Sequence, residues 1–272
     1  MAILEVNQNL CTLCGQCVAE CPVGLIRIQD RSVREIPVAE AACIACGHCV
    51  AVCPTAALDN KKSPLALQTP LSGNPLGVEE ALQFLRRRRS IRNYQEKPVP
   101  RELIVPILDA ARFAPTGGNS QGVSYLVIQN KELLELVTRK VIDWMEEQIA
   151  AQSPWSMVYE GMVRRYRKTG DDVILRRAPV LILALCDERL GLGRDNAVSA
   201  LTYAELMAPS LGLGSCWAGF VELCLMRGKT DLGKLLGVSE GKGVRAALML
   251  GFPRFTYQRL VERSALNIDW KD

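Results

Sequence analysis

The sequence lacks several features that would place the protein in other classes. It has one histidine, His48, in 272 residues, so no side-chain base is obvious and protons for a reaction would come from solvent. No hydrophobic run approaches the roughly 18 to 20 residues needed to cross a bilayer, so we expect no membrane segment. The first residues, MAILEVNQNLC, lack a basic segment followed by an apolar one, so we expect no secretory signal.

The composition describes a globular protein with two unlike parts. Hydrophobic residues make up 49% and charged residues 23%, which is enough to bury a core and keep a polar surface. The length suits one small module plus one large domain, or two domains of medium size. The net charge of +4 divides into −3 over residues 1–60 and +7 over the rest. This division favours docking of an acidic part on a basic part, and an anionic cofactor in the basic part.

Cysteine is the most informative residue type. Eight of the 11 cysteines form two copies of the pattern C-x2-C-x2-C-x3-C-P, which is typical of bacterial ferredoxins that hold two 4Fe-4S clusters. In such a run three thiolates from one loop reach one cluster, and the fourth, at the start of a short helix, reaches the other. We therefore expect one cluster on Cys11, Cys14, Cys17 and Cys53, and a second on Cys43, Cys46, Cys49 and Cys21.

Two other roles fit these cysteines less well. Pairs of the form C-x2-C also build structural zinc sites, but two runs of four that each end in proline favour clusters. The spacing also argues against a disulfide framework. Because exposed clusters need a reducing compartment, we expect the cytoplasm. His48 is interpreted as a loop residue that tunes the exposure of a cluster, and the other cysteines, Cys186, Cys216 and Cys224, are expected in the core.

The patterns predict three regions: a two-cluster ferredoxin domain over residues 1–60, a linker over 61–75 and a larger domain over 76–272. The two cysteine runs are an internal repeat, in which Cys43 to Cys53 repeats the spacing of Cys11 to Cys21, and short strands are expected at 25–29 and 33–37. In the larger domain, helices are expected over 79–89, 101–113, 131–152 and 195–211, and strands over 123–128, 180–185 and 244–253. This alternation is too irregular for a doubly wound sheet, so the predicted fold class is a layered α+β domain.

Three segments of the larger domain carry candidate binding residues. Arg88 to Arg92 places three guanidinium groups and a hydroxyl within five residues, which suits a phosphate, although a solvated helix end has the same pattern. No aromatic side chains interleave with these arginines, so we expect no nucleic acid. In Ala114 to Gly122 the glycines let a planar ring approach the backbone, and Asn119 and Gln121 can hydrogen-bond its edge, although a plain turn would look alike. The glycines of Leu211 to Phe220 follow a helix and enter a strand, the reverse of the Rossmann context.

Together these motifs resemble a known family. RRSIRNY, APTGGNSQ, LGLGSCWAG and LGFPRFTYQR occur in the order typical of the nitroreductase family of FMN-dependent enzymes. The resemblance covers the chain from about Leu76 onwards, while the segment 1–60 resembles a two-cluster ferredoxin. It implies an α+β nitroreductase-like domain that binds FMN, fused to a domain with two 4Fe-4S clusters.

The resemblance also implies roles for individual residues. The motif positions that bind FMN in the family match Arg88, Ser90 and Arg92, with Arg89 nearby. The loop that lies against the flavin of the other subunit in a homodimer matches Pro115, Thr116, Gly117 and Asn119, followed by Gln121. The loop that approaches the reactive nitrogen of the ring matches Trp217, Ala218 and Gly219. A basic residue near the C-terminus completes the phosphate clamp, with Arg259 as the first choice and Arg263 as the second.

The chain departs from the family pattern at two points. Gln121-Gly122-Val123 stands where Gln-Pro-Trp is usual, which leaves this side of the substrate pocket more open. Ala218 stands where some members have glutamate.

The fusion suggests how electrons move. We expect the clusters to relay single electrons from a donor such as reduced ferredoxin to FMN, which pairs them to reduce a nitro compound, a quinone or an activated double bond. Two alternatives stay open. One is a non-catalytic electron-transfer or redox-sensing subunit, and the other is an NAD(P)H-dependent reductase that exports electrons through the clusters.

Overall fold

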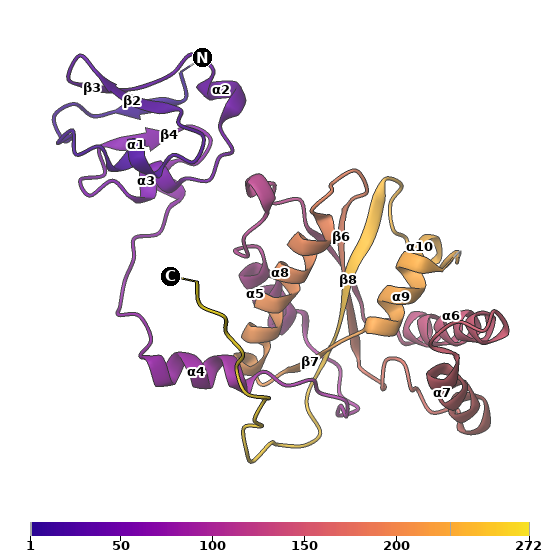
Figure 1. The fold of residues 1–272 in the computed structure, drawn as a ribbon. Helices are drawn as coiled ribbons and strands as arrows, with labels where there is room; N and C mark the ends of the chain where they lie inside the picture. Colours follow the sequence, from indigo (N-terminus) through magenta and orange to yellow (C-terminus); the bar gives the residue numbers. More distant parts are fainter. Residues whose placement is uncertain (1, 229, 272) are drawn as a thin grey trace. The chain divides into compact units, whose positions relative to one another are not determined.

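A computed structural model describes residues 2–228 and 230–271 of the chain (Figure 1). They form two compact units, which we describe separately. The first contains the chain up to Pro75 together with Gly118–Ser120, and the second contains Leu76–Gly117 and the chain from Gln121. No helix within the described ranges is both long and apolar enough to cross a membrane.

The first unit consists of two halves with similar backbone structure. Its elements are two antiparallel pairs, β1 (Leu4–Val6) with β4 (Leu58–Asn60) and β2 (Ile26–Gln29) with β3 (Ser32–Glu35), and the short helices α1 (Gln16–Glu20), α2 (Ala39–Ala42) and α3 (His48–Ala51). The offset that carries Cys11 to Cys43 also carries the start of α1 to the start of α3, and the start of β2 to the start of β4. The duplicated cysteine pattern is therefore also a duplicated backbone.

Residues just beyond β4 still pack on the first unit. The backbone N–H of Lys61 donates to the carbonyl of Ile3 at 2.9 Å. After the single turn η1 (Leu65–Leu67), the side chain of Gln68 donates to the carbonyl of Ser63 at 3.1 Å. The stretch 61–68 thus has fixed contacts, and the exact extent of the linker stays a prediction.

The second unit is a four-stranded antiparallel sheet with helices on both faces. Its strands, in the order β5-β6-β8-β7, are β5 (Ser124–Ile128), β6 (Val180–Asp187), β8 (Lys242–Gly251) and β7 (Gly214–Trp217). Ser90 adds a parallel bridge to Ser215 at the β7 edge. The α+β fold class is thereby confirmed, because a doubly wound sheet would be parallel.

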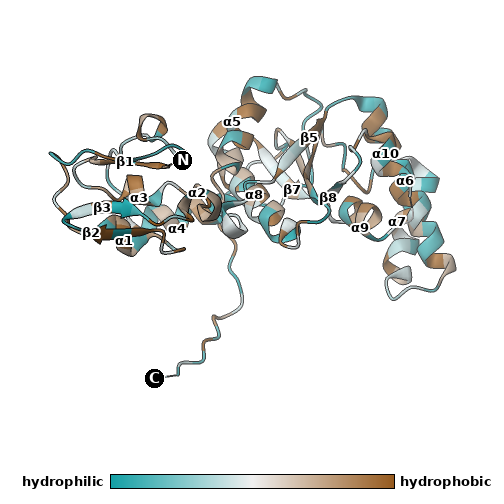
Figure 2. Ribbon diagram, turned by 90° about the horizontal axis from the view of Figure 1, so that it is seen from above, coloured by the Kyte–Doolittle hydropathy of each residue, from teal (hydrophilic) through white to brown (hydrophobic). Residues whose placement is uncertain are grey.

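Alternation along β6 explains why both faces of the sheet are covered. Leu181 and Leu183 face one core, Ile182 and Ala184 face the other, and all four are fully buried. Figure 1 shows α6 (Lys131–Ala150), α7 (Ser156–Thr169) and α9 (Gly219–Arg227) over the first face, and α5 (Arg101–Ala111) and α8 (Gly193–Met207) over the second. Figure 2 shows hydrophobic and hydrophilic residues alternating around these helices, as amphipathic packing requires.

Several helix boundaries differ from the sequence-based expectation. α4 (Val78–Arg87) ends two residues earlier than expected, so Arg88 to Arg92 lie beyond the helix. The expected helix 195–211 stops at Met207 and continues as the 3-10 turn η3 (Ala208–Leu211), which contains Pro209. α7 and α10 (Leu232–Leu235) were not predicted. Tyr159, Met162, Val163 and Tyr166 give α7 an apolar face at helical spacing that sequence analysis did not use, and α10 has only four residues.

Candidate cluster and flavin sites

The two cysteine runs surround two cavities in the first unit. The first thiolate cavity is lined by Cys11, Cys14, Cys17 and Cys53, and the second thiolate cavity by Cys21, Cys43, Cys46 and Cys49. The structure thus brings the eight cysteines together in two sets of four, with the fourth of each run in the cavity of the other. One expectation needs correction, because Cys21 and Cys53 follow the short helices α1 and α3 and do not begin a helix.

Left-handed residues bend each loop around its cavity. Leu13 and Gly15 have φ angles of 57° and 77°, and Ala45 and Gly47, at the duplicated positions, have 55° and 75°. Closely spaced left-handed residues form concave turns whose amide groups face an anion. A non-glycine residue pays strain in this region, and its recurrence in both halves indicates a functional requirement of the loop.

The sulfur atoms receive hydrogen bonds from the protein. Leu25 N donates to Cys21 Sγ at 3.3 Å, and Ala57 N donates to Cys53 Sγ at 3.2 Å. Burial raises the pKa of Cys17 and Cys49, whereas at Cys53 the effect of burial is outweighed by backbone amides, which hold its pKa below the ordinary value. Thiolates arranged around a cavity and met by N–H donors are the ligand set that an iron–sulfur cluster needs.

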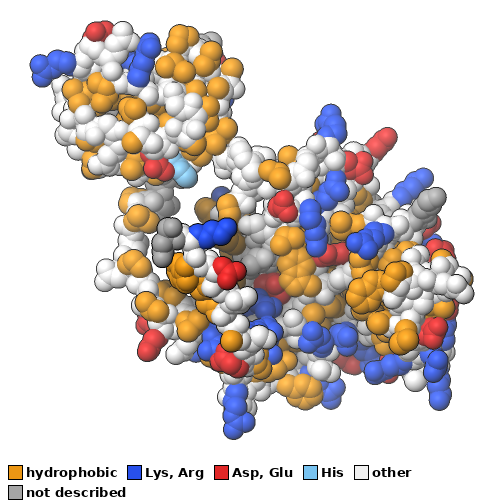
Figure 3. Space-filling model, in the orientation of Figure 1, with side chains coloured by type: hydrophobic (Ala, Val, Ile, Leu, Met, Phe, Trp, Pro, Cys, Tyr) orange, Lys and Arg blue, Asp and Glu red, His pale blue; other side chains and the backbone are white. Residues whose placement is uncertain are grey.

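Two further observations describe the surroundings of the thiolates. In residues 2–228 and 230–271, no group of three or more His, Cys, Asp or Glu side chains is placed to hold a single metal ion. His48 is exposed at the start of α3, and its Nδ1 lies 3.2 Å from Glu20 Oε1. Figure 3 shows this histidine on the surface beside an acidic side chain.

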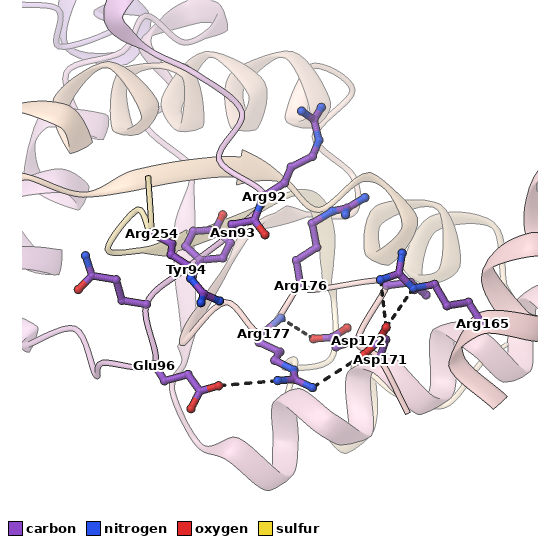
Figure 4. Close-up of a pocket in the computed structure, with 12 residues that line it drawn as sticks. Arg92, Asn93, Tyr94, Glu96, Arg165, Asp171, Asp172, Arg176, Arg177 and Arg254 are labelled. Atoms are coloured by element: carbon purple, nitrogen blue, oxygen red, sulfur yellow. Dashed lines mark hydrogen bonds and ion pairs between the residues drawn. The ribbon is translucent and has the colours of Figure 1, made fainter. Parts of the chain in front are cut away.

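In the second unit the arginine motif divides between two cavities. The first arginine cavity, of about 340 Å³, is lined by Arg88 and Arg89 together with Tyr257. The second arginine cavity, of about 560 Å³, is lined by Arg92, Arg176 and Arg254, among others (Figure 4). Gln95 lines both cavities, and Ser90 lies between Arg89 and Arg92 at the edge of β7. The face shown in Figure 3 has many Lys and Arg side chains on this unit.

In each arginine cavity one lining residue has a buried polar atom that finds no hydrogen-bond partner within residues 2–228 and 230–271. In the first this atom is Arg89 Nε, and in the second it is the hydroxyl of Tyr94, a residue that is only 7% exposed. Burial raises the pKa of Tyr94, so its hydroxyl stays a neutral donor. Buried donors without partners are uncommon in proteins, and their position here indicates a ligand.

The charges of the second arginine cavity are only partly compensated. Arg177 lies 3.7 Å from Glu96 and 4.0 Å from Asp171, and Arg165 lies 3.0 Å from Asp171 (Figure 4). Across the part of the chain that the structure describes, the guanidinium groups of Arg92, Arg176 and Arg254 form no ion pair. Unpaired guanidinium groups around a cavity favour an anionic ligand, so the residues present fit a cofactor that bears a phosphate.

A buried carboxylate joins the arginine motif to the late loop. Glu205 on α8 is 3% exposed, and its Oε1 accepts hydrogen bonds from Arg88 Nη1 at 3.4 Å and Ser215 Oγ at 3.2 Å. Its Oε2 accepts a bond from Trp217 Nε1 at 2.6 Å. Glu205 thus holds two of the predicted flavin contacts, Arg88 and Trp217. Sequence analysis missed it, although an acid on the buried side of an apolar helix, one turn after Leu201, is a signal that could have been used.

Replacing Glu205 with alanine is expected to lower the free energy of unfolding by about 3 kcal/mol, because three donors, on Arg88, Ser215 and Trp217, lose their acceptor. Urea unfolding followed by circular dichroism measures this change, and the near-ultraviolet signal of Trp217 should change with it. Glu160→Ala, at an exposed position on the helix α7, serves as the control and should stay within about 0.5 kcal/mol of the original protein. Equal losses in the two variants would contradict the role of Glu205.

The late loop is fixed mainly through its backbone. Ala218 N donates to the carbonyl of Ala247 at 2.9 Å, and Gly219 begins α9 directly afterwards. Glu222 in the first turn of α9 is 6% exposed, and it accepts a hydrogen bond from Ala247 N at 2.8 Å. The loop therefore presents a rigid edge formed by β7 and α9.

The glycine-rich loop lies elsewhere in the same chain. Gly117 N donates to Asn196 Oδ1 at 3.0 Å, and Gln121 N donates to Thr116 Oγ1 at 3.0 Å. Asn196 and Glu205 both lie on α8, and their separation in sequence corresponds to about 13 Å along the helix axis. The structure therefore does not bring Pro115, Thr116 or Gly117 together with Arg88 within one chain.

The remaining predicted positions also lie apart from the arginine cavities. Asn119 has a φ of 52° and belongs to the segment Gly118–Ser120, which is grouped with the first unit. Arg259 and Arg263 are exposed in the C-terminal stretch and line neither arginine cavity. The basic residue of this region that does line one is Arg254, which sequence analysis did not select.

Thiolates around two cavities and arginines around two others define a protein that combines iron–sulfur clusters with an anionic cofactor. Comparison with known families agrees with this combination of cofactors. The nitroreductase family matches residues 85–252, and the 4Fe-4S dicluster domain matches residues 10–57. The chain belongs to the nitroreductase family. It is an FMN-dependent oxidoreductase, and its cofactors are FMN and two 4Fe-4S clusters.

Two relatives illustrate the similarity. A candidate NADH dehydrogenase/NAD(P)H nitroreductase of Methanothermobacter thermautotrophicus is 32% identical over 53% of this chain and 63% of its own length. A protein of Archaeoglobus fulgidus with the same name is 28% identical over 65% of this chain and 87% of its own length. The match therefore spans less than two thirds of the first relative.

Solved structures share the fold of the second unit. A nitroreductase with bound FMN from Bacteroides fragilis superposes with a TM-score of 0.57 at 22% identity, covering 70% of this chain and 99% of that one. An oxidised iodotyrosine deiodinase bound to FMN and 3-iodo-L-tyrosine gives a TM-score of 0.53 at 17% identity, covering 70% of this chain and 98% of that one.

Proposed function

We propose that this chain links a one-electron donor to a two-electron acceptor. The observation that carries the proposal is the presence, in one polypeptide, of two four-cysteine cavities and a nitroreductase domain with cationic cavities. Bound FMN supplies the chemistry that connects the two, because a flavin can take up electrons singly and give them up as hydride. The donor would be a reduced ferredoxin or a similar low-potential carrier.

The roles of the binding residues follow from their positions. Arg88 and Arg89 would bind the phosphate, because both line the first arginine cavity and Arg89 Nε has no hydrogen-bond partner among the residues that the structure describes. Glu205 would hold Arg88 in place. Arg92 would face the polar part of the cofactor from the second arginine cavity, where no carboxylate pairs with it.

The late loop would form the wall against which the ring lies. Trp217 is oriented by its bond to Glu205, and Ala218 is 3% exposed and tied to β8. No side chain in this loop is a general base, so the loop would position the ring and exclude water on one side. Protons would come from solvent.

We propose further that the site is completed by a second copy of the chain. The loop of Thr116 and Gly117 is held at Asn196, about 13 Å along α8 from Glu205, which holds Arg88 and Trp217, so the two groups of predicted contacts lie apart within one chain. Leu82 and Leu85 on α4 are 50% and 52% exposed, although their helical spacing makes an apolar face. A homodimer would cover such a face and supply Thr116, Gly117, Asn119 and Gln121 to the partner's cofactor. We keep Arg259 as a proposed phosphate contact in that dimer.

The acceptor would be a small molecule such as a nitro compound, a quinone or an activated double bond. Support comes from the open second arginine cavity and from relatives named NAD(P)H nitroreductase, FMN reductase of Bacillus subtilis and iodotyrosine deiodinase. A reducing compartment such as the cytoplasm suits the exposed cysteine loops.

A second candidate function is an NAD(P)H-dependent reductase that passes electrons outward through the clusters. The observation that favours it is the unpaired Arg176 and Arg254, which could bind the phosphates of a nicotinamide nucleotide. Stopped-flow mixing with NADH, NADPH or a reduced ferredoxin separates the two functions. The primary proposal requires that the ferredoxin reduces the flavin within the time of one turnover.

A further inference from the structure

Asn60, the last residue of β4, is a buried polar side chain that faces two thiolates. It is 2% exposed and lines the second thiolate cavity. Its Nδ2 lies 3.8 Å from Cys43 Sγ and 3.8 Å from Cys49 Sγ. Its Oδ1 accepts a hydrogen bond from Lys62 N at 2.9 Å. Because the amide oxygen is used in this way, the amide N–H groups are the ones directed at the sulfur atoms.

The duplicated position in the first half of the unit has no such donor. The offset that carries Cys11 to Cys43 carries Ile28 to Asn60, and Ile28 is an aliphatic side chain in β2. Ile28 Cδ1 lies 3.9 Å from the position that a Cβ on Gly15 would take. At the duplicated Gly47 the nearest atoms are the Oγ and Cβ of Ser63 and the Nε2 of Gln68.

One backbone hydrogen bond to the sulfur of the fourth cysteine recurs in both halves. Leu25 N to Cys21 Sγ is 3.3 Å, and Ala57 N to Cys53 Sγ, the duplicated pair, is 3.2 Å. One of these fourth cysteines lies in each thiolate cavity. The side chains differ at two places. The exposed Thr55 Oγ1 lies 3.8 Å from Cys53 Sγ in the first thiolate cavity, where the duplicated residue is Val23. The buried amide of Asn60 lies against two sulfur atoms in the second.

A hydrogen-bond donor directed at the sulfur atoms of a cluster raises its reduction potential. Reduction adds one electron and one negative charge to a cluster, and hydrogen bonds to sulfur stabilise the more negative form. The effect is strongest where water is excluded, as it is at the buried Asn60. The cluster that faces Asn60 should therefore accept an electron at a higher potential than the other cluster, because a buried amide directed at two sulfur atoms outweighs an exposed hydroxyl beside one.

We propose that Asn60 makes the two clusters inequivalent, so that the one held by Cys21, Cys43, Cys46 and Cys49 is reduced first. The inference rests on the proposed assignment of cysteines to clusters. Each step transfers one electron from a reduced carrier to one cluster and needs no proton. The first electron then resides on the higher-potential cluster, whether the clusters pass electrons to the flavin or receive them from it.

The test is a potentiometric titration of the purified full-length protein, followed by electron paramagnetic resonance. The original protein should show two separate reduction steps. In Asn60→Ile, which copies the first half of the unit, the upper step should move down toward the lower step, while the lower step keeps its position. Ile28→Asn, the reverse exchange, places an amide at a position that is 43% exposed, so it should raise the lower step by less than Asn60→Ile lowers the upper one.

Two further variants keep the test decisive if Asn60→Ile loses a cluster. Asn60→Asp keeps the shape and the acceptor for Lys62 but replaces the donor by an anionic oxygen, so its upper step should also fall. Gln29→Glu adds the same charge at an exposed position on β2 and should shift either step far less, because solvent screens it. Iron and sulfide contents identify the variants that retain both clusters.

The proposal is overturned by any of three results. These are a single step for both clusters in the original protein, unchanged steps in the Asn60 variants that retain both clusters, and equal shifts of both steps in those variants. None of these readouts uses turnover, so the proposal on Asn60 can fail while the electron route proposed above holds, and the reverse is also possible.

Discussion

Cys14→Ala is expected to slow acceptor reduction by a low-potential one-electron donor at least tenfold, which corresponds to about 1.4 kcal/mol in the barrier. Cys14 is the exposed cysteine of the first thiolate cavity, and its loss leaves three thiolates where four are needed. The electron route through that cluster is then interrupted. The measurement is the steady-state rate with reduced ferredoxin as donor and a nitroaromatic compound as acceptor, under anaerobic conditions.

The matched control is Cys224→Ala, which also removes one thiol. Cys224 is fully buried in the core of the second unit and lies outside both cysteine runs, so both clusters and the electron route should be kept. Reduction of the flavin by light with a chemical donor should remain possible in Cys14→Ala, which shows that the flavin domain is intact. If Cys14→Ala reduced the acceptor at the original rate, the proposal that electrons pass through this cluster to the flavin would be wrong.

Arg88→Ala is expected to weaken FMN binding by about 10- to 100-fold, because a charge-assisted hydrogen bond contributes roughly 1.5 to 3 kcal/mol. Arg88 lines the first arginine cavity and is held by Glu205, so it is already ordered before the cofactor binds. Titration of the FMN-free protein, followed by quenching of flavin fluorescence, gives the dissociation constant. Arg101→Ala, an exposed arginine at the start of α5, removes the same charge and should bind FMN normally.

Loss of Arg88 also leaves the carboxylate of Glu205 buried without its ion-pair partner, which could unfold the site and mimic a binding defect. The double variant Arg88→Ala/Glu205→Gln separates the two effects. It removes the buried charge, so stability should return toward the original value. FMN affinity should remain low. If affinity recovered together with stability, Arg88 would not contact the FMN directly.

Periodic features of the fold could be predicted from the sequence. The repeated cysteine spacing predicted a duplicated unit, and the structure shows matching helices and strands at the same offset. The run Val180 to Leu185 predicted a buried strand, and both cores of the second unit meet on it. These predictions succeeded because each depends on local spacing, which burial on one or two faces imposes directly.

Features that depend on contacts between distant segments could not be predicted in this way. Glu205 and Trp217 are joined because α8 packs against β7, and Asn60 meets Cys43 because β4 closes the first unit. Arg254 was passed over for Arg259, since the order of residues in a motif does not give the path of the loop after β8. α7 has an apolar face at helical spacing that sequence analysis did not use, and the burial of Tyr159 depends on packing against Trp144 on α6 and Phe220 on α9.

The most direct test of the electron route is an anaerobic titration of the pure protein followed in the visible spectrum. Parallel samples receive NADH, NADPH or a low-potential one-electron donor. The account predicts that the one-electron donor bleaches both the broad cluster absorption and the flavin bands, while neither nucleotide reduces the flavin promptly. Prompt reduction by NADH or NADPH would contradict it and would identify a nicotinamide-dependent reductase whose clusters carry electrons outward.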